Sequence, residues 1–255
     1  MIENIFKPLN NNLNSLLPIG FDNVSLKLGK NYFFKKLSFI INTKGITAFI
    51  GPNGTGKSSC IKLLTGLITP ESGEIFTSLN SKKSIFPDKR FLHYKIGYVP
   101  QKIILLRRSV ENNLLHTLSV THYPANDIKE RIKEIMKFAK LEHLAKNSAR
   151  RLSVGQQQLL SIMRALIIRP QFLFLDEPCV NLDPKTTLII EDILKVVSSF
   201  GVKIIIVTHD LFQAKRLADD ILFFHDGKIL EQSKTKDFFK KPKSKEAKDF
   251  RNGLL

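Results

Sequence analysis

The sequence predicts an α/β fold with a mostly parallel sheet as its core, an antiparallel β region before it and a small helical insertion. Short apolar segments bounded by turn residues alternate with segments of helical periodicity, as in a parallel sheet covered on both faces. One stretch, between Gln101 and Arg151, departs from this alternation and shows helical periodicity alone. The chain contains no internal repeat.

The first half of the chain predicts five strands and one helix. Residues 21–28 and 35–42 have the pattern of half-buried strands, and 46–52 is an apolar strand that enters a glycine-rich turn. A helix follows and ends at Gly66, and after a turn another strand begins at Glu74. Residues 95–101 form a strand that ends at a proline-marked loop.

The helical insertion is predicted from Val110 to Lys146. Asp127 stands where an N-terminal cap is expected. Apolar residues then recur at helical intervals between charged ones, at Ile128, Ile132, Ile135, Met136 and Ala139.

Beyond the insertion the alternation of strands and helices returns. Residues 171–178 and 202–210 each contain a buried strand, and a helix ended by Gly201 lies between them. Another helix begins at Leu211, and a hairpin over 221–230 turns at an Asp-Gly pair. The lysine-rich residues from Ser233 predict a short helical appendage or tail.

This pattern predicts a flexible N-terminal arm over residues 1–20, one domain over 21–232 with the helical part at about 102–150, and a basic C-terminal tail over 233–255. The start of the chain is Asn-rich and lacks the pattern of a signal peptide. No apolar run approaches the ~20 residues that span a bilayer. We therefore expect a cytoplasmic protein.

The formal net charge of +17 has three interpretations. A basic surface can bind nucleic acid, lie near an anionic membrane leaflet, or be solvated without a specific partner. The two cysteines, Cys60 and Cys179, lack the spacing of a metal site and are expected to be reduced.

GPNGTGKS, from Gly51 to Ser58, has the spacing of a phosphate-binding loop. The preceding strand leads into a turn whose glycines let backbone N–H groups converge on phosphate oxygens, and the following helix adds its dipole. Lys57 would reach the β- and γ-phosphates of ATP and the Ser58 hydroxyl would hold Mg²⁺. The predicted nucleotide contacts are Gly51, Pro52, Asn53, Gly54, Thr55, Gly56, Lys57, Ser58 and Ser59.

FLFLDEP, from Phe172 to Pro178, places two carboxylates at the carboxyl end of a strand, where parallel sheets bind ligands. Asp176 is expected to take Mg²⁺, directly or through water, and Glu177 to act as general base on the attacking water. An acidic pair at a strand end can also be an ordinary surface feature, so this motif alone leaves both interpretations open.

RLSVGQQQ, from Arg151 to Gln158, precedes a helix-like segment, and its serine offers a hydroxyl and N–H groups to an anion at a helix start. With this third motif the chain resembles the nucleotide-binding subunit of ATP-binding cassette (ABC) transporters, a P-loop NTPase fold. The resemblance covers about nine-tenths of the chain and includes six motifs in the family's order.

The resemblance implies further roles. Gln101 in YVPQ matches the glutamine loop, which senses Mg²⁺ and the γ-phosphate, so the implied metal contacts are Ser58, Gln101 and Asp176. His209 matches the switch histidine and is, with Glu177, an implied catalytic residue. The residues that would touch ATP bound to a second copy are Ser153, Val154, Gly155 and Gln156 of the signature and Asp183 of the NLDP segment.

Three positions depart from the family pattern. Val154 replaces the first signature glycine, although Gly155 remains to donate its N–H. Leu28 stands where an aromatic residue usually stacks on adenine, and Tyr32, Phe33 or Phe34 could replace it. Cys179 replaces the usual small hydroxyl residue.

The resemblance implies ATP and Mg²⁺ as cofactors, and as partners a second copy, integral-membrane permease subunits and an extracytoplasmic solute-binding protein. Two segments, 101–114 and 208–232, are similar to tungstate importer ATPases, with phosphate and molybdate importers as near relatives. The implied location is the cytoplasmic face of the membrane. A soluble ABC ATPase that acts on nucleic acid or ribosomes is the alternative, but such proteins usually carry two cassettes or long coiled-coil insertions, and no nucleic acid is expected. A degenerate cassette that binds ATP without hydrolysing it is a second alternative, against which Glu177 and His209 argue.

Overall fold

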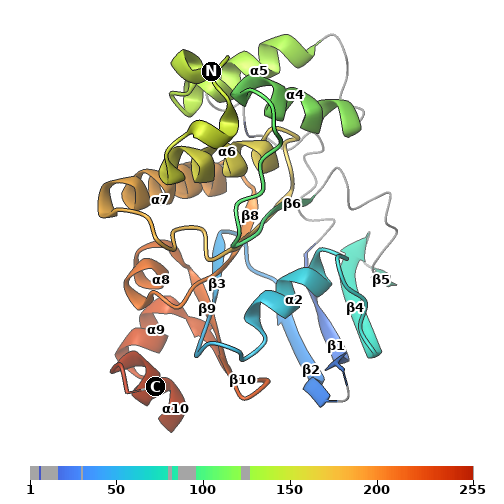
Figure 1. The fold of residues 1–255 in the computed structure, drawn as a ribbon. Coiled ribbons are helices and arrows are strands. Elements are labelled where there is room, and N and C mark those ends of the chain that lie inside the picture. The colour runs from blue at the N-terminus through green and yellow to red at the C-terminus, as the bar shows by residue number, and fades with distance from the viewer. Residues whose placement is uncertain are drawn as a thin grey trace. The chain divides into compact units, whose positions relative to one another are not determined.

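The computed structural model describes Phe6 and residues 17–29, 31–79, 82–85, 96–121 and 127–254. The chain divides into two compact units. Of the described residues, unit 1 contains Phe6 and residues 96–203, and unit 2 contains those between 17 and 85 together with 204–254. Both units combine strands with helices, which confirms the predicted α/β class (Figure 1).

Unit 2 contains an antiparallel sheet with the strand order β2-β1-β4-β5. In β1, Ile19 and Gly20 already pair with Ile41 and Ile40, so the strand begins two residues before its predicted start. Phe21 of β1 and Phe39 of β2 bury their rings together, with centroids 4.7 Å apart. The strands are β1 (Ile19–Leu28), β2 (Asn31–Ile41), β4 (Ser72–Leu79) and β5 (Lys82–Ile85).

The mostly parallel strands of unit 2 have the order β10-β9-β3-β8. β3 (Ile46–Ile50) is parallel to both β8 (Lys203–Val207) and β9 (Asp220–His225), while β10 (Lys228–Lys234) is antiparallel to β9. Asp226 and Gly227 both have positive φ in the predicted turn of this hairpin. Every residue of β3 is buried, as expected of a central parallel strand.

Among the described residues, the helices of unit 2 are α2 (Lys57–Leu64), α8 (Leu211–Leu217), α9 (Thr235–Lys240) and α10 (Lys245–Arg251). α2 ends at the predicted Gly66, whose φ is +68°. The last two helices form the predicted appendage, which lies beside β9 and β10 (Figure 1). Phe238 and Phe250 anchor it, with ring centroids 5.9 and 5.3 Å from that of Phe223.

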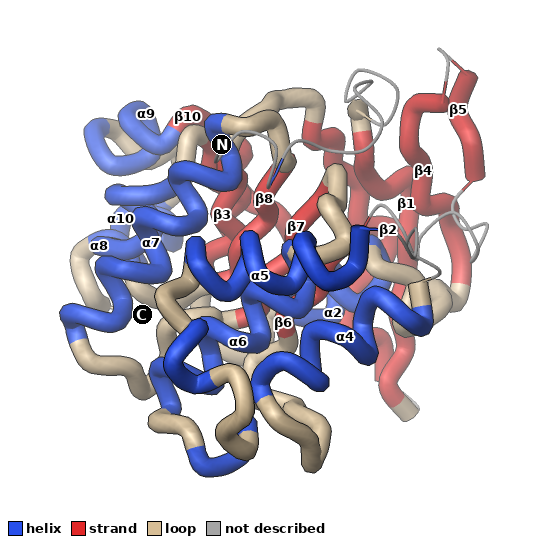
Figure 2. The backbone as a smooth tube through the Cα atoms, turned by 90° about the horizontal axis from the view of Figure 1, so that it is seen from above, coloured by secondary structure: helices blue, strands red, loops and turns tan. Residues whose placement is uncertain are grey.

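Unit 1 contains a parallel pair, β6 (Ile96–Val99) and β7 (Phe172–Asp176). Its helices are α4 (Val110–Val120), α5 (Ile128–Phe138), α6 (Val154–Leu166) and α7 (Pro184–Ser199), with short 3₁₀ turns at Glu142–Leu144 and Ala149–Arg151. α4 packs against α5 and α6 (Figure 2).

Two contacts in unit 1 join segments far apart in the sequence. The buried Arg131 of α5 donates from Nε to Ile167 O at 2.9 Å and from Nη2 to Leu166 O at 3.2 Å, so it satisfies carbonyls that the end of α6 leaves open. The ring of Phe6 is buried, 4.6 Å from that of Phe138 and 6.4 Å from that of Phe200.

One predicted cap differs from the structure. Asp127 precedes α5, but its side chain makes no cap hydrogen bond. Its φ of −107° and ψ of −2° are not the extended values of a capping residue.

Candidate functional site

The segment Gly51–Ser58 links β3 to α2 as the sequence predicts, and we call it the phosphate-binding loop. The Lys57 side chain is buried inside it and donates from Nζ to Gly51 O at 2.8 Å and to Pro52 O at 2.7 Å. Gly51, Gly54 and Gly56 all have positive φ, which a side chain would oppose. The loop therefore holds a positive charge at the start of a helix, an arrangement suited to phosphate.

His209 lies at the same sheet edge of unit 2 as this loop. β3 and β8 are parallel with Phe49 opposite Val207, so both strands end at that edge. The Thr208 N–H donates to Phe49 O at 3.2 Å, and Thr208 Oγ1 accepts from the Asp210 N–H at 3.0 Å. The exposed His209 is thus held between two anchored neighbours.

Unit 1 brings Gln101, Asp176 and Glu177 to the carboxyl ends of adjacent parallel strands. Val99 of β6 pairs with Leu175 of β7, and the predicted residues follow within two positions. Asp176 and Glu177 are only 3% and 8% exposed. This edge therefore carries two buried carboxyl side chains beside an exposed amide.

The electrostatics of this edge are visible at Tyr98 of β6. Burial and the nearby charge of Asp176 raise the pKa of the Tyr98 hydroxyl to about 12. Glu177 has a φ of +49°, a conformation that L-residues adopt at some cost and that is frequent at functional sites.

The signature segment, Arg151–Gln158, forms a capping box at the start of α6. Ser153 Oγ accepts from the Gln156 N–H at 3.3 Å, and the Ser153 N–H donates to Gln156 Oε1 at 3.1 Å. Val154 is 56% exposed, so its side chain does not fill the space beside the helix start.

Asp183 caps α7 in the same unit. Its Oδ1 accepts from the Thr186 N–H at 3.0 Å, and its Oδ2 accepts from the Thr186 hydroxyl at 2.6 Å. These bonds hold the pKa of the Asp183 carboxyl below its ordinary value. Thr186 also lies against Gly155, and sequence reasoning missed it because nothing local distinguishes it from Thr187.

The glycine of the phosphate-binding loop that faces the aromatic segment is Gly56. A Cβ atom placed there would meet Phe34 Cδ1 at 3.2 Å and Phe33 Cε1 at 3.3 Å. Phe34 is buried and Phe33 half-buried, whereas Tyr32 is exposed with Lys27 and Lys35 over its ring. The side chain of Leu28 lies outside the described residues.

Comparison with known proteins decides the family. The family model described as "ABC transporter" matches residues 34–180. The phosphate import ATP-binding protein PstB of Mycoplasma mobile is 35% identical over 265 residues, covering 98% of this chain and 93% of that protein. The chain belongs to the ABC transporter family.

Other proteins resemble this ABC chain. The molybdate/tungstate import ATP-binding protein WtpC of Methanocaldococcus jannaschii is 32% identical over 88% of the chain and 73% of that relative. A solved dimeric ATP-binding cassette in a post-hydrolysis state with ADP and Pi has a TM-score of 0.74 and 28% identity, covering 85% of this chain and 98% of its own. Membership of this family makes the chain an ATP hydrolase of the ABC type.

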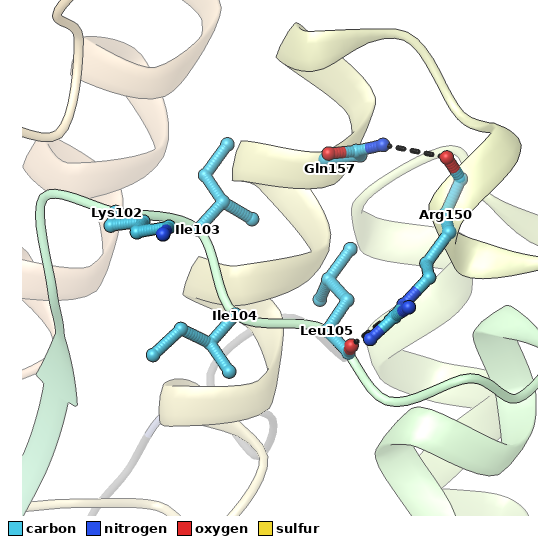
Figure 3. Close-up of a pocket in the computed structure, with 6 residues that line it drawn as sticks. All are labelled: Lys102, Ile103, Ile104, Leu105, Arg150 and Gln157. Carbon is cyan, nitrogen blue, oxygen red and sulfur yellow. Dashed lines mark hydrogen bonds between the residues drawn. The ribbon is translucent and has the colours of Figure 1, made fainter.

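A pocket of about 290 Å³ lies within unit 1 of the ABC chain and is lined by residues that follow Gln101 (Figure 3). Gln157 donates to Arg150 O at 3.1 Å, and Arg150 donates from Nε to Leu105 O at 3.4 Å, so two segments are tied across it. The side chain of Ile104 is 63% exposed at this pocket. The lining residues are Lys102, Ile103, Ile104, Leu105, Arg150 and Gln157.

Two features are absent from the described part of the ABC chain. None of its helices is both long and apolar enough to pass through a bilayer. It also contains no cluster of three or more His, Cys, Asp or Glu side chains that could hold a metal ion.

Proposed function

We propose that this ABC ATPase powers the import of an inorganic oxyanion such as tungstate. The ATPase part of this proposal rests on one observation: the phosphate-binding loop and His209 lie at the same sheet edge of unit 2. The oxyanion part is supported by two relatives, whose names state phosphate import and molybdate/tungstate import. Phosphate, molybdate or another solute are the alternative cargoes.

The chemistry assigned to the chain follows from the residue types. Lys57 binds the β- and γ-phosphates once nucleotide displaces its two carbonyl contacts. Glu177 accepts a proton from the attacking water, and His209 contacts the γ-phosphate.

Mg²⁺ fits the residues assigned to it. It needs only one or two carboxylates, because phosphates and waters complete its octahedral shell. Asp176 is a buried carboxyl at the end of β7 and would supply that group, while Ser58 and Gln101 would add oxygen ligands. The ion would neutralise charge on the phosphates during transfer.

A second copy of the chain completes the nucleotide site. Ser153, Gly155 and Gln156 present a capped helix start, and Asp183 stands at the start of a neighbouring helix. In this proposal they meet ATP bound to the partner copy. The exposed Val154 side chain then faces the partner and reduces how tightly two copies close.

Permease subunits are the proposed partners of the segment after Gln101, with residues 102–150 as the part that contacts them. Its pocket combines the exposed Ile104 with Lys102 and Arg150, which suits an apolar side chain and an acidic group on the permease. The ATPase then lies peripherally on the cytoplasmic face of the membrane, and an extracytoplasmic binding protein delivers the solute.

Elemental analysis of cells tests the cargo. Tungsten, molybdenum and phosphorus are measured in cells with the intact gene, with Lys57→Ala and without the gene. A tungsten deficit in the last two supports the proposal. A deficit in molybdenum or phosphorus alone would identify the oxyanion of that element, and not tungstate, as the cargo. Unchanged content of all three would exclude tungstate, molybdate and phosphate as the cargo.

A nucleic-acid-dependent ATPase is the rival that the net charge of +17 suggests. Duplex binding that falls steeply with salt, together with stimulation of ATP hydrolysis by the duplex, would favour it over a transporter subunit.

A further inference from the structure

Unit 2 contains a cavity that none of the nucleotide motifs lines. It has a volume of about 390 Å³ and lies between α8 and α9. This volume is in the range of small-molecule sites and exceeds that of a bare phosphate ion. The lining residues are Lys215, Thr235, Lys236, Phe239 and Lys240.

Three lysines gather at this cavity without a counter-charge. Within the described chain, the ammonium groups of Lys215, Lys236 and Lys240 form no ion pair. Lys215 Nζ instead lies 5.6 Å from the centroid of the Phe239 ring. Three like charges around one cavity repel each other, so an anion with two negative charges would stabilise the arrangement.

No acidic residue is among the residues that line the cavity. Asp220 pairs with Lys234, whose Nζ lies 2.9 Å from Asp220 Oδ1. Asp237 lies on α9 itself but is not among the lining residues. The cavity therefore presents positive charge.

Thr235 adds a buried donor to the lining. Its side chain is 6% exposed, and its Oγ1 has no hydrogen-bond partner among the described residues. Buried hydroxyl groups are nearly always paired, because an unpaired one is costly. Its position is fixed, since the Thr235 N–H donates to Asp219 O at 3.0 Å. A ligand oxygen in the cavity would satisfy this hydroxyl.

The cavity wall is held in place by the core of unit 2. Phe238, next to Phe239, packs on Phe223 of β9. Arg251 of α10 donates from Nη1 to Phe239 O at 3.0 Å. The half-buried Phe239 ring gives this cationic cavity one apolar side.

We propose that this cavity binds a soluble small molecule with a doubly charged phosphoryl group attached to a compact apolar or ring-bearing body. The lysines bind the phosphoryl oxygens as point charges, the Thr235 hydroxyl donates to one of them, and Phe239 packs against the body. The site is separate from the proposed nucleotide chemistry and does not depend on it.

Calorimetric titration of the full-length chain with phenyl phosphate tests the proposal. The titration is run in a Lys57→Ala background to weaken the phosphate-binding loop, at constant ionic strength and at pH 8, where the phosphoryl group is a dianion. We expect saturable binding that Lys236→Ala/Lys240→Ala weakens at least about tenfold. The control Lys245→Ala/Lys248→Ala removes the same charge from α10, whose two lysines do not line the cavity, and should change the affinity less than about twofold.

Two further measurements distinguish a specific binding site from nonspecific attraction to a charged surface. Thr235→Val keeps the shape of the side chain and removes the donor. It should lower the affinity for phenyl phosphate about fivefold or more. Inorganic phosphate should bind more weakly than phenyl phosphate because it lacks the ring. Absence of saturable binding would overturn the proposal. So would an equal loss of affinity for phenyl phosphate in the Lys245→Ala/Lys248→Ala control. So would lysine-dependent binding to phosphatidylglycerol vesicles without binding of phenyl phosphate.

Discussion

Thr186 lies directly against Gly155: a Cβ atom placed on Gly155 would stand 2.7 Å from Thr186 Cγ2. The other branch of Thr186, its hydroxyl, donates to Asp183 Oδ2 at 2.6 Å. One threonine therefore links the start of α6, in the signature segment, to the cap of α7. Gly155 is needed for packing as well as for any contact with nucleotide.

Gly155→Ala should destabilise unit 1 by about 1–3 kcal/mol, because the added methyl group overlaps Thr186. Alanine is otherwise the better helix former by about 1 kcal/mol, so the clash alone makes the change unfavourable. Urea unfolding of the wild type and of Gly155→Ala measures the difference in the free energy of unfolding. In a Thr186→Ser background, which removes Cγ2 and keeps the hydroxyl, Gly155→Ala should become neutral or stabilising. The same loss in both backgrounds would show that Thr186 is not the obstacle.

Phe33 is the aromatic residue that we expect to stack on adenine. It is half-buried beside Gly56 of the phosphate-binding loop, whereas Phe34 is buried in the core. Phe33→Ala should raise the KM for ATP about tenfold, the loss typical of one stacked base. Tyr32→Ala, which removes a ring already covered by two lysines, serves as the control and should leave KM unchanged. The opposite pattern would assign the role to Tyr32.

Asp183 should contribute to the acid sensitivity of the protein. Hydrogen bonds from Thr186 lower its pKa below the ordinary 3.8. The stabilisation is therefore present above the unfolded value and is lost as pH falls through the lower folded value. Between pH 5 and pH 3, the free energy of unfolding should fall more steeply in the wild type than in Asp183→Asn. Parallel curves would show that this carboxyl makes no such contribution.

The two cysteines should differ in reactivity. Complete burial raises the pKa of the Cys60 thiol well above its ordinary value, whereas Cys179 is half-buried beside the Asp176–Glu177 edge. Iodoacetamide acts on the thiolate, so native protein at pH 8 should be labelled at Cys179 first. Mass spectrometry of tryptic peptides gives the order, with urea-unfolded protein as the reference. Faster native labelling of Cys60 would mean that α2 opens readily.

The elements that could be predicted from the sequence are those determined by residues close together in the chain. The phosphate-binding loop, the apolar strands before Asp176 and His209, and the Asp-Gly hairpin each depend on neighbours within a few residues. The boundaries of these strands and helices consequently agree with the structure to within a few positions.

Contacts between distant segments were not predictable in this way. Arg131 reads as one more charged residue on an amphipathic helix, yet it is buried against the end of α6. Phe6 stands in a polar, Asn-rich segment and gives no periodic signal. In the C-terminal segment two well-placed rings, Phe238 and Phe250, are enough to anchor two helices that composition alone describes as a basic tail.

Glu177→Gln tests the central claim, hydrolysis of ATP with a carboxylate base, most directly. Phosphate release by the purified chain is compared with ATP affinity and with ATP-dependent dimer formation in sedimentation. We predict that release falls at least about 100-fold while ATP binding persists and the dimer with ATP becomes longer-lived. Phosphate release at the wild-type rate by Glu177→Gln would contradict the assigned mechanism.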